Sequence, residues 1–591
     1  MANRDDPTSA RRTGRGGRER PAKGQRTCLI PTGASPGIGA GFRSLPGTAR
    51  RFVPIVVLVM AASACLPASI EGDPVAPAWP ADLPASAGAE GFGRYATGWR
   101  GGEVIKVTTL EDRGPGSLRA CAEDDRPRVC IFEVAGTIAV DSTIAVGSNV
   151  YLAGQTAPGA GVQLRLGHSP HRPLMVRAAS DVVIRHLRLR PGPSRVPSGN
   201  VDGIGIYDSR DVILDHLSVQ FATDELLDIG TLGGSAYDIT VQDSLLAWGL
   251  DRANHPRRRH SKGALICAMN SRGECGRITV LRNLFAHNRD RNPDVKGTSI
   301  GPVEIVNNVF YDPISQFGEF YDLYGDLRIN YIGNSALRGP STRRTDVPYA
   351  FDIDDFHPSF EVLVYVRDNL DPHRRAPTDP DALVAPPDDR AWLVAAPFSP
   401  LTVTALPADA VRDVVLANAG ATRPMRDALD RRVIADVARR TGRVIDDPAE
   451  VGGWPRLRPG ATPPDADGDG MPDAWEVGHG TDPQAFDAWG DVDGNGWPDL
   501  EDYLNERAGI LAPMQHAAQA CPLGSGFAAC GLGLGHVHRA GAGKKPEPLS
   551  PAPSLRGGSR RKRSATLLLD RRLRRRAIAT MRKAMARVRP G

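Results

Sequence analysis

The sequence predicts an all-β protein whose main domain is a parallel β-helix, a solenoid in which every coil adds strands to the same few sheets. Two observations carry this prediction. Between about residues 148 and 370, segments made of a turn and a short strand recur with starts roughly 24 to 40 residues apart, a spacing that indicates a solenoid. The composition is also rich in turn formers, with 64 Gly and 50 Pro, and only 6% of the residues are aromatic.

The repeated segments alternate apolar and polar residues, as strands with one face in a core do. They read SNVYLAG, SDVVIRHLRLR, SRDVILDHLSVQ, AYDITVQDSLLAW, GRITVLRNLFAHN, GPVEIVNNVFYD and GDLRINYIGNSAL. An antiparallel sandwich is the competing fold, but the connections are irregular and lack the dipeptides of tight hairpins. Asn283, Asn307 and Asn308 fall where coils should bend, and we expect such side-chain amides to stack in ladders.

The N-terminal region differs from the body of the chain in composition. Residues 1–51 are basic and predicted to be disordered, and residues 66–90 are rich in Pro and Ala, as linkers are. Residues 52–65 contain an apolar run that is too short to span a bilayer, so we expect a signal peptide. The run ends in Ala-Ser-Ala-Cys, which fits either ordinary cleavage or a lipid anchor on Cys65. We therefore expect an exported bacterial protein, either secreted or held at the outer membrane as a lipoprotein.

Six further cysteines follow as three local pairs. They are Cys121/Cys130, Cys267/Cys275 and Cys521/Cys530. An even number of cysteines in an exported chain predicts disulfides. No CxxC occurs, which argues against a zinc site.

The C-terminal part divides into three segments after the predicted β-helix domain at residues 91–404. Residues 405–460 show helical spacing of apolar residues and are predicted to cover the β-helix. Residues 461–508 are acidic and form a small unit. Residues 509–591 are a basic, low-complexity tail. The positive charge behind the net charge of +5 is concentrated at the two ends of the chain. The tail has no recognisable nucleic-acid fold, so we expect no nucleic-acid partner, and we expect a monomer.

The acidic unit contains two twelve-residue loops with the spacing of an EF-hand. Positions 1, 3, 5, 9 and 12 of the first loop are Asp465, Asp467, Asp469, Asp473 and Glu476. The same positions of the second loop are Asp491, Asp493, Asn495, Asp499 and Asp502. This pattern predicts a paired calcium-binding module, similar to dockerin-like and thrombospondin type 3-like repeats. A structural role is expected rather than a signalling role.

A second set of charged residues follows the repeats in the order NVDGIGI, VILDH, TDELLDI, HSKG and RDRNPDVKG. This is an acidic cluster followed by one Lys and an Arg-x-Pro segment. In this order the motifs resemble the pectate lyase family, the family-1 polysaccharide lyases, over roughly residues 91–455. The resemblance implies a right-handed parallel β-helix and Ca²⁺-dependent β-elimination of an acidic polysaccharide, pectate or polygalacturonate.

The resemblance also implies a calcium site on the β-helix. Asp202, Asp224 and Asp228 match the acidic ligands of the family, and Asn200 stands where a further acid is often found. Ca²⁺ prefers several oxygen ligands. A cation on the C6 carboxylate of galacturonate would stabilise the charge that develops when the C5 proton is removed.

Three cations complete the implied active site. Arg291 matches the proton-abstracting Arg of the family and Lys262 matches the Lys that binds a substrate carboxylate. Lys296 falls where a second Arg is common, and Lys cannot bind a carboxylate in bidentate fashion. Arg is normally always protonated, so we expect Ca²⁺ and Lys262 to disfavour its charged form and activity to rise at alkaline pH. The pair Asp215-His216 matches a family signature, and we expect it to be structural rather than catalytic.

Two other functions stay open at this point. One is a non-catalytic cell-surface β-helix protein that binds polysaccharide, although the presence of both Arg291 and Lys262 argues against it. The other is a hydrolase on the same fold, such as a polygalacturonase. That chemistry needs acids clustered around a water, whereas the acids here are arranged more like calcium ligands.

Overall fold

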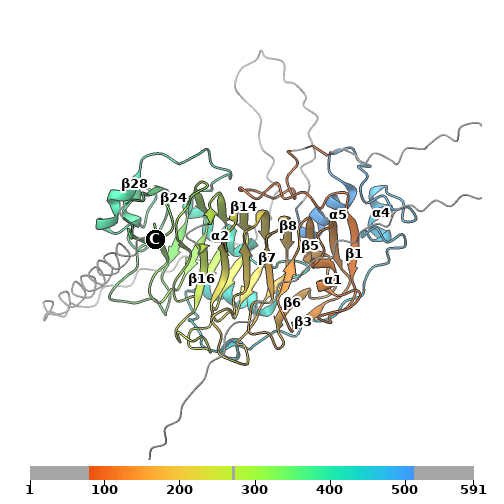
Figure 1. Ribbon diagram of the computed structural model, residues 1–591, viewed down its shortest axis with the longest axis horizontal. Coiled ribbons are helices and arrows are strands. Elements are labelled where there is room, and N and C mark those ends of the chain that lie inside the picture. The colour runs from red at the N-terminus through yellow and green to blue at the C-terminus, as the bar shows by residue number, and fades with distance from the viewer. Residues whose placement is uncertain (1–78, 81, 269–272, 358, 511–591) are drawn as a thin grey trace, which may run out of the picture. The chain divides into compact units, whose positions relative to one another are not determined.

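The computed structural model describes residues 79–80, 82–268, 273–357 and 359–510. In this part of the chain the strands form three sheets, A, B and C, in which every pairing is parallel (Figure 1). The predicted parallel β-helix is therefore confirmed. The predicted leader, the signal peptide, the pair Cys521/Cys530 and the tail beyond residue 510 lie outside the described residues.

Each strand belongs to one of the three sheets. Sheet A has twelve strands: β1 (Glu103–Val107), β2 (Arg128–Phe132), β5 (Val150–Ala153), β8 (Ser180–Arg185), β11 (Arg210–Asp215), β14 (Ser235–Gln242), β17 (Glu274–Cys275), β18 (Ile278–Leu281), β21 (Val303–Val306), β24 (Leu327–Ile332), β27 (Val362–Arg367) and β28 (Leu393–Val394). Sheet B has eight: β3 (Gly136–Val140), β6 (Val162–Leu166), β9 (Arg188–Leu189), β12 (Ser218–Gln220), β15 (Leu245–Ala247), β19 (Leu284–Ala286), β22 (Val309–Tyr311) and β25 (Ser335–Leu337). Sheet C also has eight: β4 (Ile144–Val146), β7 (Leu174–Arg177), β10 (Ile204–Tyr207), β13 (Glu225–Gly230), β16 (Lys262–Ala268), β20 (Asp294–Val295), β23 (Gly318–Tyr321) and β26 (Phe351–Asp354).

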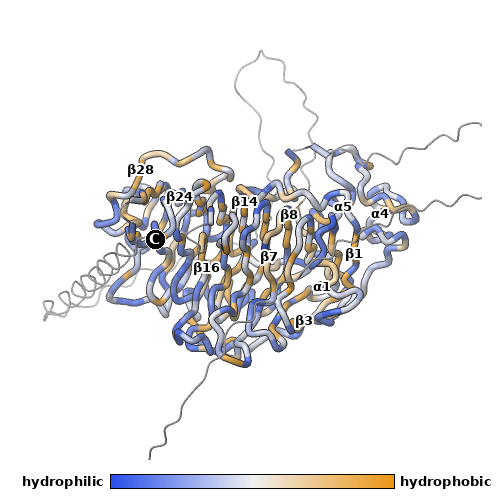
Figure 2. The backbone as a smooth tube through the Cα atoms, in the orientation of Figure 1, coloured by the Kyte–Doolittle hydropathy of each residue, from blue (hydrophilic) through white to orange (hydrophobic). Residues whose placement is uncertain are grey.

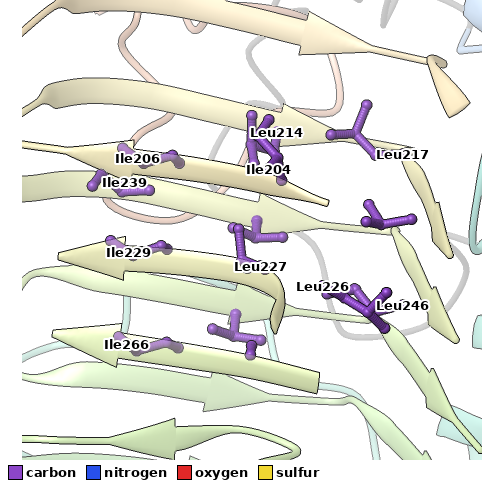
Figure 3. Packing of buried hydrophobic residues seen from close by; sticks show 14 of the residues in the cluster. Ile204, Ile206, Leu214, Leu217, Leu226, Leu227, Ile229, Ile239, Leu246 and Ile266 are labelled. Carbon is purple, nitrogen blue, oxygen red and sulfur yellow. The ribbon is translucent and has the colours of Figure 1, made fainter. Parts of the chain in front are cut away.

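The core lies inside the coils, where inward side chains of successive coils stack in register. Ile206 pairs with Ile229, and Ile229 pairs with Ile266, so three isoleucines form one column (Figure 3). All three are fully buried, and burying such a side chain contributes about 1.5–3 kcal/mol. Hydrophobic positions recur on successive strands for the same reason (Figure 2). Because residues alternate between the two faces, the intervening positions point outward.

An asparagine ladder joins the bends between sheets A and B. The Nδ2 of Asn283 donates to Oδ1 of Asn308 at 3.1 Å, and Asn308 donates in turn to Asn334 at 3.0 Å. Asn334 continues the ladder to Asn369 at 3.0 Å. The predicted ladder therefore exists, but Asn307 is not part of it, because its amide donates to the backbone carbonyls of Gly333 and Leu406.

Two predicted disulfides are present. Cys121 and Cys130 join α1 (Leu118–Ala122) to β2, and Cys267 and Cys275 join β16 to β17. No helix in the described part of the chain has the length and apolar character needed to cross a membrane.

The helices of residues 405–460 cover sheet B. They are α2 (Ala408–Asn418) and α3 (Ala428–Arg439), and their buried valines pack with outward residues of β15, β19 and β22. An ion pair between buried groups fixes this cover, because Arg190 binds Asp427, the N-cap residue of α3, at 2.6 Å.

The acidic unit at residues 461–508 packs on the outward face of sheet A in the first coils. Its helices are α4 (Asp473–His479) and α5 (Asp499–Ala508), and α5 lies beside β1 and β5 (Figure 1). Leu500, Tyr503 and Leu504 of α5 share a buried cluster with Tyr151. The same cluster contains Ala85, so the last residues of the predicted linker are packed rather than extended.

Candidate active site

The outward face of sheet C carries the charged residues that the sequence singled out. Ile204 and Ile206 point into the core, so Gly205 and its partner Asp228 point outward. Glu225 at the start of β13 pairs with Lys262 at the start of β16. Strand β20 adds Asp294 on the next coil, in register with Leu265. The parallel register thus brings residues from four coils to one face.

Three carboxylates form a close group on this face. Asp202, Asp224 and Glu225 each have an oxygen within 4.8 Å of the others. Arg172 donates to Asp202, and the backbone N–H of Glu225 donates to the other oxygen of Asp202 at 3.3 Å. Burial and the neighbouring Glu225 and Asp202 raise the pKa of Asp224 to about 10. Mutual repulsion of this strength favours a bound cation.

Asp228 lies beside this group. The hydroxyl of Tyr207 donates to its Oδ2, while its Oδ1 is buried without a hydrogen-bond partner. Burial and the charge of Glu225 raise the pKa of Asp228 to about 6. A buried carboxylate oxygen without a partner is costly. The donor set on this face, carboxylates only, therefore fits a hard cation such as Ca²⁺.

Arg291 is held by two carboxylates. It donates to Glu225, and its Nε lies 3.2 Å from Oδ2 of Asp294. Burial acts to lower the pKa of Arg291, but Glu225 and Asp294 outweigh it and raise the pKa above the ordinary value. The expectation that Ca²⁺ and Lys262 disfavour the charged form therefore stays a prediction, and these two carboxylates act against it. Sequence reasoning missed Glu225 and Asp294, although Glu225 directly follows Asp224 in TDELLDI.

The two lysines come from adjacent coils, since Lys262 begins β16 and Lys296 directly follows β20. The Nζ of Lys262 binds Asp290 at 2.5 Å, and Asp290 also accepts from the hydroxyl of Ser315. Lys296 is half-buried; its burial and the nearby charge of Arg291 lower its pKa. Three cations therefore face the region of the acidic group, which is the arrangement expected for binding the carboxylates of a polyanion.

Two stacked histidines support Asp224, and sequence reasoning missed them. The rings of His255 and His260 are 3.8 Å apart, and their Nε2 atoms lie 3.6 Å and 2.7 Å from the two oxygens of Asp224. The backbone N–H of Arg257 donates to Nδ1 of His255. The Nδ1 of His255 thus accepts a hydrogen bond, so in the neutral ring the proton lies on Nε2, the nitrogen that is nearer to Asp224.

Asp215 and His216 are structural. Oδ1 of Asp215 lies 2.5 Å from Nδ1 of His216, and Arg185 donates to its Oδ2 at 2.6 Å. Both Asp215 and Arg185 are fully buried. The expected hydrogen-bonding role of this pair is thus observed at the ends of β8 and β11.

The two C-terminal loops gather their acids unevenly. Asp465, Asp467 and Asp469 of the first loop lie within 4.8 Å of one another. Asp473 and Asp499 start α4 and α5, and each accepts a backbone N–H from its own loop, that of Ala466 or Val492. In the second loop, the side-chain amide of Asn495 donates to Asp493 at 3.0 Å and to Asp502 at 2.8 Å. Asp491 accepts the N–H of Gly496 at 3.1 Å.

No family model matches the chain. "Probable pectate lyase C" of Aspergillus flavus is 34% identical over 439 residues, which cover 74% of this chain and 96% of the relative. The protein of the same name from Neosartorya fischeri is 35% identical over 431 residues, covering 72% and 93%. Among solved structures, the major allergen from cedar pollen is 18% identical with a TM-score of 0.40, covering 56% of this chain and 92% of that one.

These relatives correct the predicted localisation. They come from fungi, and a further relative comes from the plant Arabidopsis thaliana. The prediction of a bacterial cell-surface lipoprotein anchored through Cys65 is therefore wrong. It rested on four residues, Ala-Ser-Ala-Cys, in a segment outside the described residues.

Proposed function

This chain belongs to the pectate lyase family, and we propose that it cleaves pectate or polygalacturonate by Ca²⁺-dependent β-elimination. The observation that carries the proposal is the meeting of Arg291 with an acidic group and Lys262 on one face of sheet C. A lyase of this kind needs a base, a cation and donors for the substrate carboxylates within reach of one sugar unit.

We assign the cation to the acidic group of Asp202, Asp224 and Asp228, with Glu225 added. The unpartnered Oδ1 of Asp228 and the raised pKa of Asp224 support this assignment. When bound, Ca²⁺ supplies electrostatic stabilisation of the charge that develops on the C6 carboxylate. Asp202 and Glu225 are at present bound by Arg172 and Arg291, so these guanidinium groups compete with a cation for the same oxygens.

Arg291 is the proposed base for the C5 proton. As long as Glu225 and Asp294 bind it, the charged form is favoured, so loss of these contacts and alkaline pH both increase the neutral form. Lys262 and Lys296 are proposed to bind substrate carboxylates and to hold the sugar against Arg291. Both are positioned by the parallel register of β16 and β20.

The paired C-terminal loops are proposed to bind Ca²⁺ as structural sites. The first loop offers Asp465, Asp467, Asp469 and Glu476, and the second offers Asp491, Asp493, Asn495 and Asp502. The buried and unpartnered oxygens of Glu476 and Asp469 support the first site. These loops lie outside sheet C, so we expect them to stabilise the protein and not to take part in elimination.

Product analysis on polygalacturonate tests the proposal. The full chain should form unsaturated uronate, detected by its ultraviolet absorbance, with Ca²⁺ and not with a chelator. Reducing ends without that absorbance would indicate a hydrolase. No product of either kind, with retained binding of the polysaccharide, would indicate a non-catalytic binding protein.

A further inference from the structure

Five carboxylates converge at the first C-terminal loop, and one of them comes from outside its twelve residues. Asp469 and Glu476 of the loop form a group with Asp487, in which each has an oxygen within 4.8 Å of the others. Asp465 and Asp467 join through Asp469, which is common to both groups of this loop. Asp487 lies in the segment between the two loops, where the EF-hand spacing predicts no ligand.

The oxygens of this cluster lack partners to an unusual degree. Glu476 and Asp469 are both 0% exposed, yet neither oxygen of Glu476 has a hydrogen-bond partner. The Oδ2 atoms of Asp467 and Asp469 and the Oδ1 of Asp487 are also buried without partners. A buried carboxylate without a partner is unfavourable. A hard cation with oxygen ligands supplies the missing partner.

Asp487 also begins a short segment that contacts the β-helix. The next residue, Ala488, is fully buried in the cluster on sheet A. The indole of Trp489 donates to the carbonyl of Gly102 at 3.1 Å, directly before strand β1, and its ring lies 6.3 Å from that of Trp99. The chain from Asp487 to Trp489 therefore runs from the carboxylate cluster to the first coil in three residues.

We infer that Asp487 is a ligand of a Ca²⁺ ion that it shares with Asp467, Asp469 and Glu476, and that this ion docks the acidic unit on the first coils of the β-helix. The ion fixes the Asp487 carboxylate, and this places Ala488 and Trp489 against Gly102. The inference rests on the proposed calcium loops and does not depend on the proposed lyase reaction. Lys106, whose Nζ binds Asp465 at 2.9 Å, adds a second tie between β1 and the same loop.

Thermal unfolding of the full chain shows whether the carboxylate cluster binds a cation or only makes structural contacts. Glu476→Gln removes a buried charge without changing shape. In a chelator the variant should be at least as stable as wild type, whereas in Ca²⁺ its melting temperature should rise less than that of wild type, because only the other proposed Ca²⁺ sites remain intact. Asp487→Asn should need on the order of tenfold more Ca²⁺ for the same increase, because the ion loses a charged ligand. Asp482→Asn, an exposed acid of the same segment, is the matched control and should behave as wild type.

Hydrogen exchange tests the docking. With Ca²⁺, peptides covering residues 482–490 and 100–107 should both gain protection in wild type and in Asp482→Asn, and not in Asp487→Asn. Protection confined to residues 465–476 would overturn the docking. A normal Ca²⁺ response of Asp487→Asn in both measurements would overturn the ligand. The product assay on wild type is read separately, so a missing lyase activity would overturn the proposed function and leave these results standing.

Discussion

Arg291 donates a hydrogen bond to Glu225, so the proposed base and a member of the acidic group form one ion pair on the outward face of sheet C. The pair is largely buried, with 18% of the Arg291 side chain and 5% of the Glu225 side chain exposed. Each partner is therefore held in its charged form by the other until a cation or substrate separates them. Asp294 lies 3.2 Å from the same guanidinium, and burial together with the charge of Glu319 raises the pKa of this carboxyl group well above its ordinary value.

Asp294→Asn should shift the pH dependence of turnover toward lower pH. Burial lowers the pKa of Arg291, and the carboxylates of Glu225 and Asp294 raise it above its ordinary value. Removing the Asp294 charge lowers that pKa, so the neutral base is available at lower pH. The measurement is kcat against pH at saturating substrate and Ca²⁺. The control is Asp326→Asn, which removes a half-exposed acid paired with Arg328 at the start of β24, and it should leave the profile unchanged. An unshifted profile in Asp294→Asn would argue against Arg291 as the titrating group.

Asp228→Ala should raise the Ca²⁺ concentration needed for half-maximal activity and recover at high Ca²⁺. The substitution removes a carboxylate whose Oδ1 has no partner, and it leaves Arg291 in place. Activity as a function of Ca²⁺ concentration measures the effect. Arg291→Lys provides the contrast, because added Ca²⁺ should not rescue it. If the activity of Asp228→Ala stayed equally low at every Ca²⁺ concentration, the assignment of Asp228 as a ligand would be contradicted.

The repeat pattern predicted the fold because each coil depends on the same local rules. Alternation placed Ile206, Ile229 and Ile266 in one column, and the Asn positions predicted the ladder through Asn283 and Asn308. The contacts of Asn307 could not be predicted from the repeat. Its side-chain amide donates to the backbone carbonyl of Gly333 on another coil and to that of Leu406 in the segment that covers sheet B.

The site was predicted only in part, for a related reason. Motif spacing found Asp202, Asp224, Asp228, Lys262 and Arg291. It missed Asp294, although this residue lies three positions after Arg291, and Glu225, although it follows Asp224. It also missed His255 and His260, which meet Asp224 from another coil. Asp487 was missed because it lies outside the twelve-residue loop.

Asp427→Asn should destabilise the cover of sheet B in a pH-dependent way. Burial acts to raise the pKa of Asp427, but Arg190 and Arg188 outweigh it and lower the pKa to about 2. A lowered folded-state pKa gives stability that is complete above the unfolded value near 4 and is lost as pH falls toward 2. We expect a loss of about 3 kcal/mol at neutral pH, which shrinks below pH 4.

Urea unfolding of the full chain at several pH values measures this effect. Asp413→Asn, on the exposed face of α2 with 77% of its side chain exposed, is the matched control and should change stability little at any pH. A loss in Asp427→Asn that is as large at about pH 2.5 as at about pH 7 would contradict the ion-pair account.

The most direct test of the central claim compares wild type with Arg291→Lys in the formation of unsaturated uronate from polygalacturonate. Both are assayed at saturating substrate and Ca²⁺ from neutral to alkaline pH. The account predicts that the wild-type rate climbs with pH, while Arg291→Lys loses about 10²–10⁴-fold in kcat with little change in KM, as removal of a base acting only in the transition state requires. Near-normal kcat of Arg291→Lys at every pH would contradict the account and assign the proton to another group.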